Sequence, residues 1–341
     1  MSDPRKTRRR SISSRPSRSA KGRQERVTEL ENPVSEDLDR KTVPQILQLI
    51  NREDQKVPQT VGKTIHQIAR AVEWAADSMV EGGRLVYIGA GSSGRLGVLD
   101  AAECAPTFNT DRVVAVLAGG PRAMFKPVEK IEDSPAFAER DLRKIRLSRK
   151  DILVGISASG TTPYTLAGVR YARKLGARTV AITCNPHAPL RRAARLAIVP
   201  VVGPEVVAGS TRMKAGTAQK LILNMLSTAT MARLGRVLSG WMISVQLNNE
   251  KLRARGRKIL AKLTGARPEA VEWALRASAG NLPVAILMLE KHISGRRANR
   301  LIRHSASPAA LIRSALAGKR PGPRFPSVKM GDGLPKFAAR R

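Results

Sequence analysis

Aromatic residues are scarce in this sequence, at 3% of 341 residues. Alanine, leucine, valine and isoleucine must therefore build the core, and they suit the close packing of helices on a sheet in an α/β protein. Two cysteines are present, Cys104 and Cys184, and their spacing fits neither a zinc site nor a disulfide framework, so we expect a cytoplasmic protein. No apolar run approaches the length of a membrane span, and none follows the basic N-terminus as in a signal peptide. We therefore expect no membrane partner.

Acidic residues are also few, since 27 Asp and Glu stand against 61 Lys and Arg, for a net charge of +34. The chain ends are strongly basic. Residues 1–26 include ten basic and two acidic residues, and residues 319–341 include seven basic residues and one acidic residue. We expect both ends to be disordered tails, although the first also has the composition of a transit peptide. More than half of the excess positive charge lies between these two ends, where almost no aromatic residues stand among the basic ones. This distribution predicts attraction to anions in general and no specific nucleic-acid partner.

The most informative stretch is 84–103, where an apolar run meets a Gly/Ser turn and then a helical pattern. In the first loop (residues 89–94), Gly91 allows a sharp turn and close approach, and Ser92 and Ser93 offer hydroxyls beside free N–H groups. The loop matches the dinucleotide pattern G-x-G-x-x-G, which alone is weak. The acidic residue that this pattern needs could only be Asp111, which precedes the next strand instead of ending it. A phosphosugar is therefore the favoured ligand.

Apolar strands and helical patterns alternate along the middle of the chain. The expected strands are 85–88, 113–117, 151–157, 179–183 and 197–201. Short buried strands separated by helices predict a doubly wound, parallel five-stranded sheet, which binds ligands at the carboxyl ends of its strands.

Helical patterns flank this region. We expect helices at 42–51 and 59–79, and a long one from Ser210 to Leu234 with Ser210 and Thr211 as caps. Beyond Gly235 the alternation stops and only helices are expected. The predicted organisation is a basic tail at 1–26, a ligand-binding α/β domain at 27–235, a small all-helical domain at 236–318 and a second tail at 319–341.

A second loop (residues 157–163) gathers hydroxyls between a strand and a helix. Its candidate binding residues are Ser157, Ser159, Gly160, Thr161 and Thr162. One such loop would more simply be an ordinary capped helix start, but two on neighbouring strand ends favour a phosphate site.

Cations and carboxylates complete the candidate site. Arg212 and Lys214, like Arg95, stand at predicted helix starts, where a cation is unfavourable unless an anion also binds; chance placement is the alternative in so basic a chain. Glu103 and Glu132 could act as a general acid and base beside a bound sugar, although for any single Glu a solvated position is more common. The four histidines lack metal spacing, so we assign no metal.

Three long motifs resemble the N-acetylmuramic acid 6-phosphate etherases. They are residues 87–104, with the sequence YIGAGSSGRLGVLDAAEC, residues 183–186, TCNP, and residues 209–220, GSTRMKAGTAQK. Shorter segments also fit, so the resemblance covers about residues 28–290. It implies a sugar-isomerase-type α/β domain followed by a small three-helix domain, an architecture shared with glucokinase regulatory proteins, in a homodimer.

The resemblance also implies a reaction. Members of the family cleave the ether between D-lactate and the sugar, releasing N-acetylglucosamine 6-phosphate. Glu103 matches the acid that protonates the departing oxygen, and Glu132 matches the second carboxylate, the base at C2. No cofactor is implied, because the substrate's own carbonyl is the electron sink. Thr161 replaces the arginine usual in the family, which puts the exact substrate in question. The alternative is a phosphosugar-binding regulator without turnover.

Overall fold

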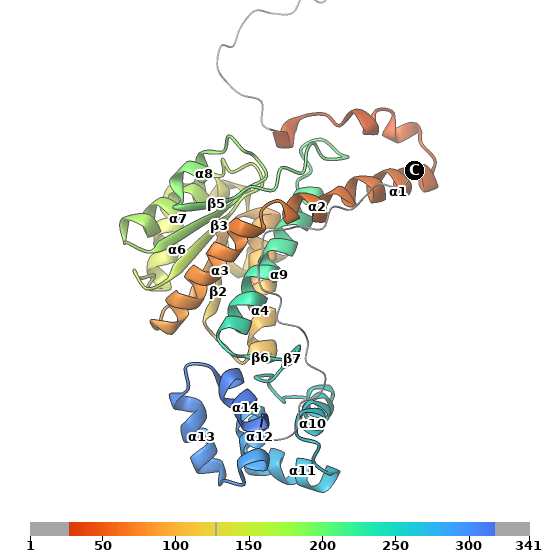
Figure 1. The fold of residues 1–341 in the computed structure, drawn as a ribbon. Coiled ribbons are helices and arrows are strands. Elements are labelled where there is room, and N and C mark those ends of the chain that lie inside the picture. The colour runs from red at the N-terminus through yellow and green to blue at the C-terminus, as the bar shows by residue number, and fades with distance from the viewer. Residues whose placement is uncertain (1–26, 127, 318–341) are drawn as a thin grey trace, which may run out of the picture.

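The structure, a computed structural model, describes residues 27–126 and 128–317. Its centre is a five-stranded parallel sheet in the order β2-β1-β3-β4-β5 (Figure 1). The strands are β1 (Leu85–Gly89), β2 (Val113–Leu117), β3 (Ile152–Ile156), β4 (Arg178–Ile182) and β5 (Leu196–Ile198). The predicted doubly wound parallel sheet is confirmed. Because β1 lies between β2 and β3, the chain reverses its direction of winding there, and such a point opens a crevice at the carboxyl ends of the strands.

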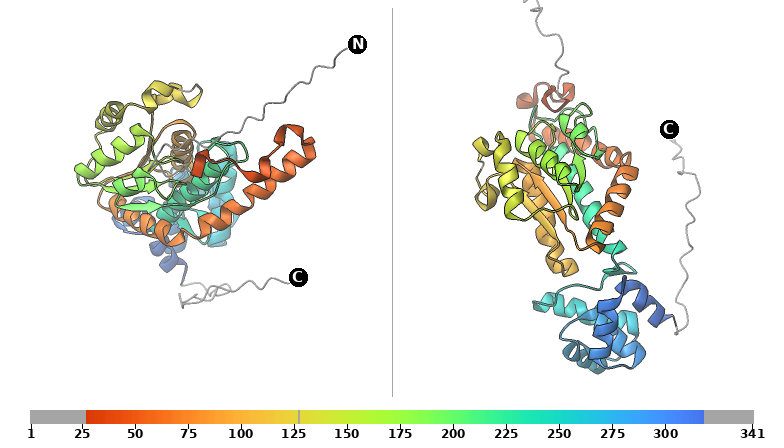
Figure 2. Two further views of the ribbon diagram at one scale, coloured as in Figure 1. Left: turned by 90° about the horizontal axis from the view of Figure 1, so that it is seen from above. Right: turned by 90° about the vertical axis from the view of Figure 1, so that its left-hand side faces the viewer.

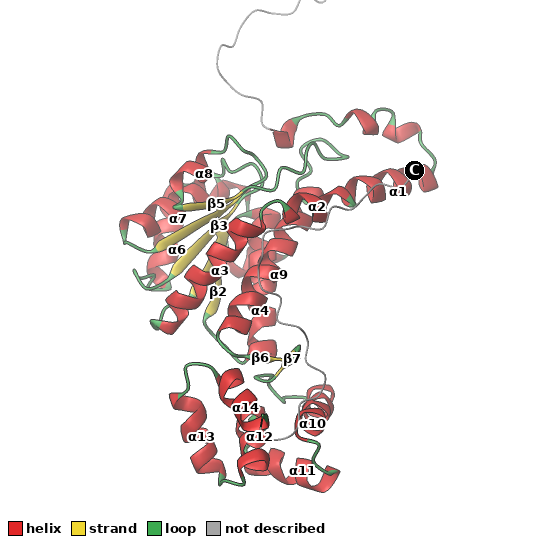
Figure 3. Cartoon of the chain, in the orientation of Figure 1, coloured by secondary structure: helices red, strands yellow, loops and turns green. Residues whose placement is uncertain are grey.

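Helices cover both faces of this sheet (Figures 2 and 3). One face packs against α3 (Ile65–Val80), α4 (Gly91–Phe108) and α9 (Lys214–Arg233). The other packs against α6 (Pro135–Lys144), α7 (Pro163–Lys174) and α8 (Pro189–Ala193). Successive residues of a strand point to opposite faces, so Tyr87 of β1 joins the first core and Ile88 joins the second. This burial on both sides explains why the strands are continuous apolar runs.

An N-terminal arm (residues 27–54) projects from the body. Residues 27–41 run outward, and α1 (Val43–Asp54) returns to α2 (Lys56–Gly62) at the sheet (Figure 1). The arm also contains the short helices η1 (Val27–Glu29), η2 (Pro33–Ser35) and η3 (Leu38–Arg40). The expected single helix at 59–79 is wrong, because the chain breaks after Gly62. There the Thr64 hydroxyl donates to the Val61 carbonyl at 2.8 Å, and this local bond competes with the helical ladder.

The C-terminal region begins with a two-stranded hairpin, β6 (Val237–Leu238) and β7 (Trp241–Met242). The expectation of helices alone beyond Gly235 is therefore wrong at this point. Ser239 and Gly240 both have positive φ, 48° and 79°, which is the geometry of a tight two-residue hairpin turn.

Up to residue 317, where the described part of the chain ends, five helices follow the hairpin around an apolar core of their own (Figure 1). They are α10 (Glu250–Thr264), α11 (Pro268–Ala277), α12 (Leu282–Lys291), α13 (Gly295–His304) and α14 (Pro308–Leu316). The domain boundary at 235/236 stays a prediction, and both predicted tails, 1–26 and 319–341, lie outside the described residues. Among the described residues, no helix has both the length and the apolar character needed to cross a membrane.

Candidate active site

The first loop turns directly from β1 into α4. Gly91 adopts a left-handed φ of 51° at the first position of the helix, and its preceding residue, Ala90, has no side chain that could cap it. The first N–H groups of α4 therefore remain available at the positive end of the helix dipole. A Cβ at Gly94 would lie 2.5 Å from the Gly89 carbonyl oxygen, so this tight turn needs glycine. Ser92 is half-buried and Ser93 is buried in the same turn.

The second loop follows β3, the strand that pairs with β1. The Ser157 and Thr162 hydroxyls lie 3.0 Å apart, as do those of Ser159 and Thr161. Gly160 has φ of 66°, and a Cβ there would lie 2.3 Å from the Cβ of Ala188. The loop is thus held in one tight conformation that gathers four hydroxyls.

Glu132 lies between the two loops. It ends the short helix α5 (Glu129–Glu132), which follows η4 (Gly120–Met124) beyond β2. Its Oε1 accepts a hydrogen bond from the Thr162 hydroxyl at 3.5 Å, and its Oε2 lies 3.8 Å from the Cβ position of Gly91. The structure therefore brings both predicted loops and one predicted glutamate together at the carboxyl ends of β1 and β3. A carboxylate here faces the start of α4, whose dipole favours the ionised form.

Glu103 does not join this group within one chain. It lies on α4, twelve residues beyond Gly91, and its side chain is exposed. At 1.5 Å per residue this is about 18 Å along the helix axis. Asp100 on the same helix accepts hydrogen bonds from the Tyr87 hydroxyl at 2.9 Å and the Ser227 hydroxyl at 3.2 Å, and these bonds fix α4 against β1 and α9.

The predicted cations have different surroundings. Arg212 is exposed in the segment after β5, whereas Lys214 is 1% exposed, and its Nζ lies 2.6 Å from Oε2 of Glu53. Burial alone would raise the pKa of the Glu53 carboxyl, but hydrogen bonds from Lys214, Lys56 and Asn32 outweigh it and lower the pKa to about 2. Lys214 is thus engaged inside the protein and is not brought to the two loops.

The start of α9 also differs from the sequence expectation. Ser210 and Thr211 are not its caps, because the helix begins at Lys214. The buried carboxylate of Glu205 accepts from the N–H groups of Lys214 and Ala215, both at 2.9 Å, and so takes the role of a cap. Glu205 precedes the helix by nine residues, which is outside any local capping pattern.

Comparison with known proteins places the chain. Residues 67–173 match the family model of the glucokinase regulatory protein N-terminal SIS domain, and residues 126–229 match that of the SIS domain. An N-acetylmuramic acid 6-phosphate etherase of Rhodopirellula baltica is 48% identical, covering 81% of this chain and 92% of the relative. An etherase of the same name from Pectobacterium atrosepticum is 46% identical, covering 86% and 96%. This chain belongs to the N-acetylmuramic acid 6-phosphate etherase family.

Among solved structures, a phosphoheptose isomerase from Neisseria gonorrhoeae aligns with 56% of this chain and 100% of its own, at 16% identity and a TM-score of 0.43.

In this member of the etherase family, two residues that were not among the predicted site residues support the second loop. Asn185 donates to the Ser159 carbonyl at 3.2 Å, and the Thr183 hydroxyl donates to the Ala158 carbonyl at 3.1 Å. Both follow β4 and belong to the motif at 183–186 on which the family resemblance rests, so the sequence did single them out. The motif did not indicate their role, which is to bond the backbone of the second loop.

Proposed function

We propose that this chain cleaves the D-lactyl ether of N-acetylmuramic acid 6-phosphate, giving N-acetylglucosamine 6-phosphate and D-lactate. The observation that carries the proposal is Glu132, a carboxylate held between two hydroxyl-rich loops at the carboxyl edge of the sheet. The substrate identity rests on the relatives that share the family, since they match over four fifths of the chain. We further propose that the reaction takes place in the cytoplasm, which suits the two unpaired, buried cysteines.

The two loops are the proposed phosphate site. The N–H groups that open α4 and the hydroxyls of the loops offer the donors that a phosphate dianion accepts. The proposed ligands in the first loop are Gly91, Ser92 and Ser93. Those in the second are Ser157, Ser159, Gly160, Thr161 and Thr162. Thr161 offers a neutral hydroxyl where the family usually has a guanidinium, so we expect weaker attraction for the anion at this position.

The proposed elimination proceeds from the open-chain sugar, whose aldehyde at C1 acidifies the C2 proton. Glu132 takes that proton, the electron pair forms a C2–C3 double bond, and the bond from C3 to the lactyl oxygen breaks. Glu103 gives its proton to the departing oxygen. Water then adds at C3, and C2 recovers a proton. Each general acid or base contributes about two to four powers of ten in rate.

Since Glu103 lies about 18 Å along α4 from the loops of its own chain, we propose that the site is completed in a homodimer. Glu103 of one subunit would meet Glu132 of the other. Leu99, one turn before Glu103, is 43% exposed, and Val43 and Leu47 of the arm are 69% and 60% exposed. These exposed apolar side chains are available to pack against a second subunit.

The test consists of two measurements. One is the release of D-lactate from N-acetylmuramic acid 6-phosphate, and the other is the binding of N-acetylglucosamine 6-phosphate by calorimetry. An etherase binds the product and releases lactate. Binding without any release at high protein concentration would instead support a phosphosugar-binding regulator of the same fold and would overturn the proposal.

A further inference from the structure

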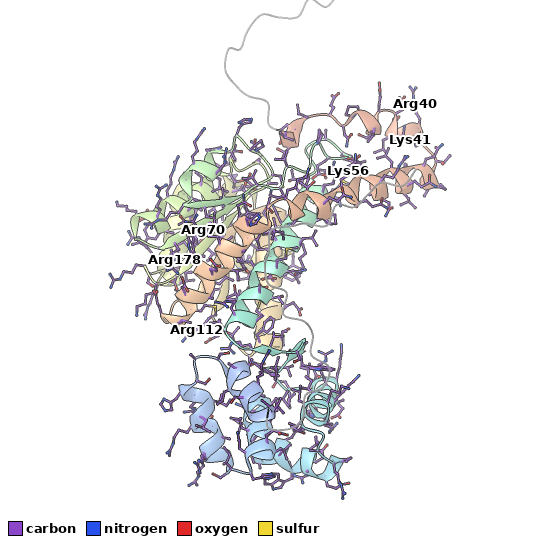
Figure 4. The ribbon with its side chains drawn as sticks, viewed as in Figure 1. Arg40, Lys41, Lys56, Arg70, Arg112 and Arg178 are labelled. Carbon is purple, nitrogen blue, oxygen red and sulfur yellow. The ribbon has the colours of Figure 1, made fainter. Side chains whose placement is uncertain are left out.

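Four buried polar side chains meet where the arm joins the body. They are Asn32, Glu53, Glu205 and Lys214, which are between 1% and 9% exposed. Asn32 donates both to Oε2 of Glu53 and to the Pro204 carbonyl, each at 3.1 Å. Lys56 also forms an ion pair with Glu53, and Figure 4 shows Lys56 at the base of the arm. Burying such charges is costly unless each is paired or hydrogen-bonded, so these contacts hold the four segments together.

The cluster closes a loop. The chain leaves the sheet after Ile198, and residues 206–213 form the last part of the connection to α9. Glu205, just before them, accepts from the N–H groups of Lys214 and Ala215, just after them. The Lys214 side chain then joins this closed base to Glu53 of α1. Both ends of the loop are therefore fixed to each other and to the arm.

Arg212 belongs to the segment that leads from β5 to α9. Because the sheet is parallel, β5 ends at the same edge of the sheet as β1 and β3, the strands that precede the two hydroxyl-rich loops. The first turn of α9 packs next to the start of α4, since a Cβ at Gly216 would lie 3.9 Å from Cδ1 of Leu96. The Arg212 side chain is exposed, in contrast to the buried Lys214 two residues later.

We propose that Glu53 and Lys214 are positioning residues, whose buried pair holds loop 206–213 where Arg212 binds the lactyl carboxylate of the substrate. This inference rests on the proposed function. The substrate has two anionic groups, and the two hydroxyl-rich loops accept the phosphate. An arginine is the residue best suited to pair with the remaining carboxylate, because its planar fork matches the two oxygens.

The matched control is a second ion pair with a buried carboxylate, at the amino ends of the strands. Asp151, 2% exposed in its side chain, pairs with Arg84 at 3.0 Å beside the amino ends of β1 and β3. Glu53→Gln and Asp151→Asn each remove one buried carboxylate charge at nearly constant volume. Both variants should melt at lower temperature than the wild type, because Glu53→Gln leaves the buried Lys214 and Asp151→Asn leaves the half-buried Arg84 without its carboxylate partner.

Glu53→Gln alone should raise KM for lactate release, by about ten-fold or more, the factor expected for a lost hydrogen bond to a charged group. Its affinity for N-acetylglucosamine 6-phosphate, which lacks the lactyl carboxylate, should not change. Arg212→Gln should raise KM similarly, and the combined variant should be no worse than either alone, since both act on one contact. If Glu53→Gln does not fold, the double variant Glu53→Gln/Lys214→Met removes both buried charges. It should show the same rise in KM over the wild type that is expected for Glu53→Gln.

An unchanged KM in Glu53→Gln, an equal rise in Asp151→Asn, or additive effects of Glu53 and Arg212 would overturn the inference. If the wild type releases no lactate, the proposed function fails by itself. The inference is then decided by calorimetry, in which Glu53→Gln must bind N-acetylmuramic acid 6-phosphate more weakly than the wild type does and N-acetylglucosamine 6-phosphate equally well.

Discussion

At the scale of single residues, Glu132 and Glu103 have contrasting surroundings. Glu132 is half-buried, accepts a hydrogen bond from the Thr162 hydroxyl and faces the start of a helix. Glu103 is exposed on the side of α4. The two roles proposed for them can be separated, because removing the C2 proton does not require an acid at the leaving oxygen.

Glu103→Gln should stop lactate release yet still exchange the C2 proton of the substrate with heavy water, whereas Glu132→Gln should suppress both. Each loss of rate should be about two to four powers of ten. NMR detection of deuterium at C2 measures the exchange. Exchange at the wild-type rate in Glu132→Gln would show that Glu132 is not the base. A rise in KM without a fall in kcat would instead indicate that the residue only positions the sugar.

At the scale of elements, the second loop depends on a glycine that satisfies two demands at once. Gly160 has a left-handed φ of 66°, and it also lies so close to Ala188 and Thr183 that a Cβ would collide with both. Gly120, after β2, has the same φ of 66° but nothing within 4 Å of its Cβ position. Comparing alanine substitutions at Gly160 and Gly120 therefore separates the cost of backbone strain from the cost of a steric clash.

Gly160→Ala should lower the free energy of unfolding by more than Gly120→Ala, which bears only the cost of strain, about 1–3 kcal/mol. It should also weaken binding of N-acetylglucosamine 6-phosphate, because the loop must move to admit the methyl group. Thermal unfolding and calorimetry measure the two effects. Equal stability and unchanged binding in the two variants would contradict the tight loop described above.

Much of the element order could be predicted from the sequence, because parallel strands buried on both faces are continuous apolar runs. The strand at 113–117 was predicted with its observed bounds. The start of α9 could not be predicted, since its cap comes from Glu205, nine residues upstream. The break after Gly62 was also missed, because a single helical pattern continues across it.

At the scale of the whole molecule, the candidate site residues lie in two separate places. The two hydroxyl-rich loops and Glu132 meet within one chain, as sequence motifs at neighbouring strand ends predicted. The separation of Glu103 from the two loops was missed, although twelve residues of predicted helix between Gly91 and Glu103 already imply about 18 Å along the helix axis. This separation is the reason for our proposal that one glutamate of the site comes from a second copy of the chain.

Lactate release by mixed dimers tests this account most directly. Wild-type protein should release D-lactate from N-acetylmuramic acid 6-phosphate, and Glu103→Gln and Glu132→Gln alone should release almost none. Dimers re-formed from an equal mixture of the two variants should recover about a quarter of wild-type activity, because half of them are mixed and one of their two sites keeps both glutamates. A mixture no more active than its components, or a wild type that releases no lactate, would contradict the account.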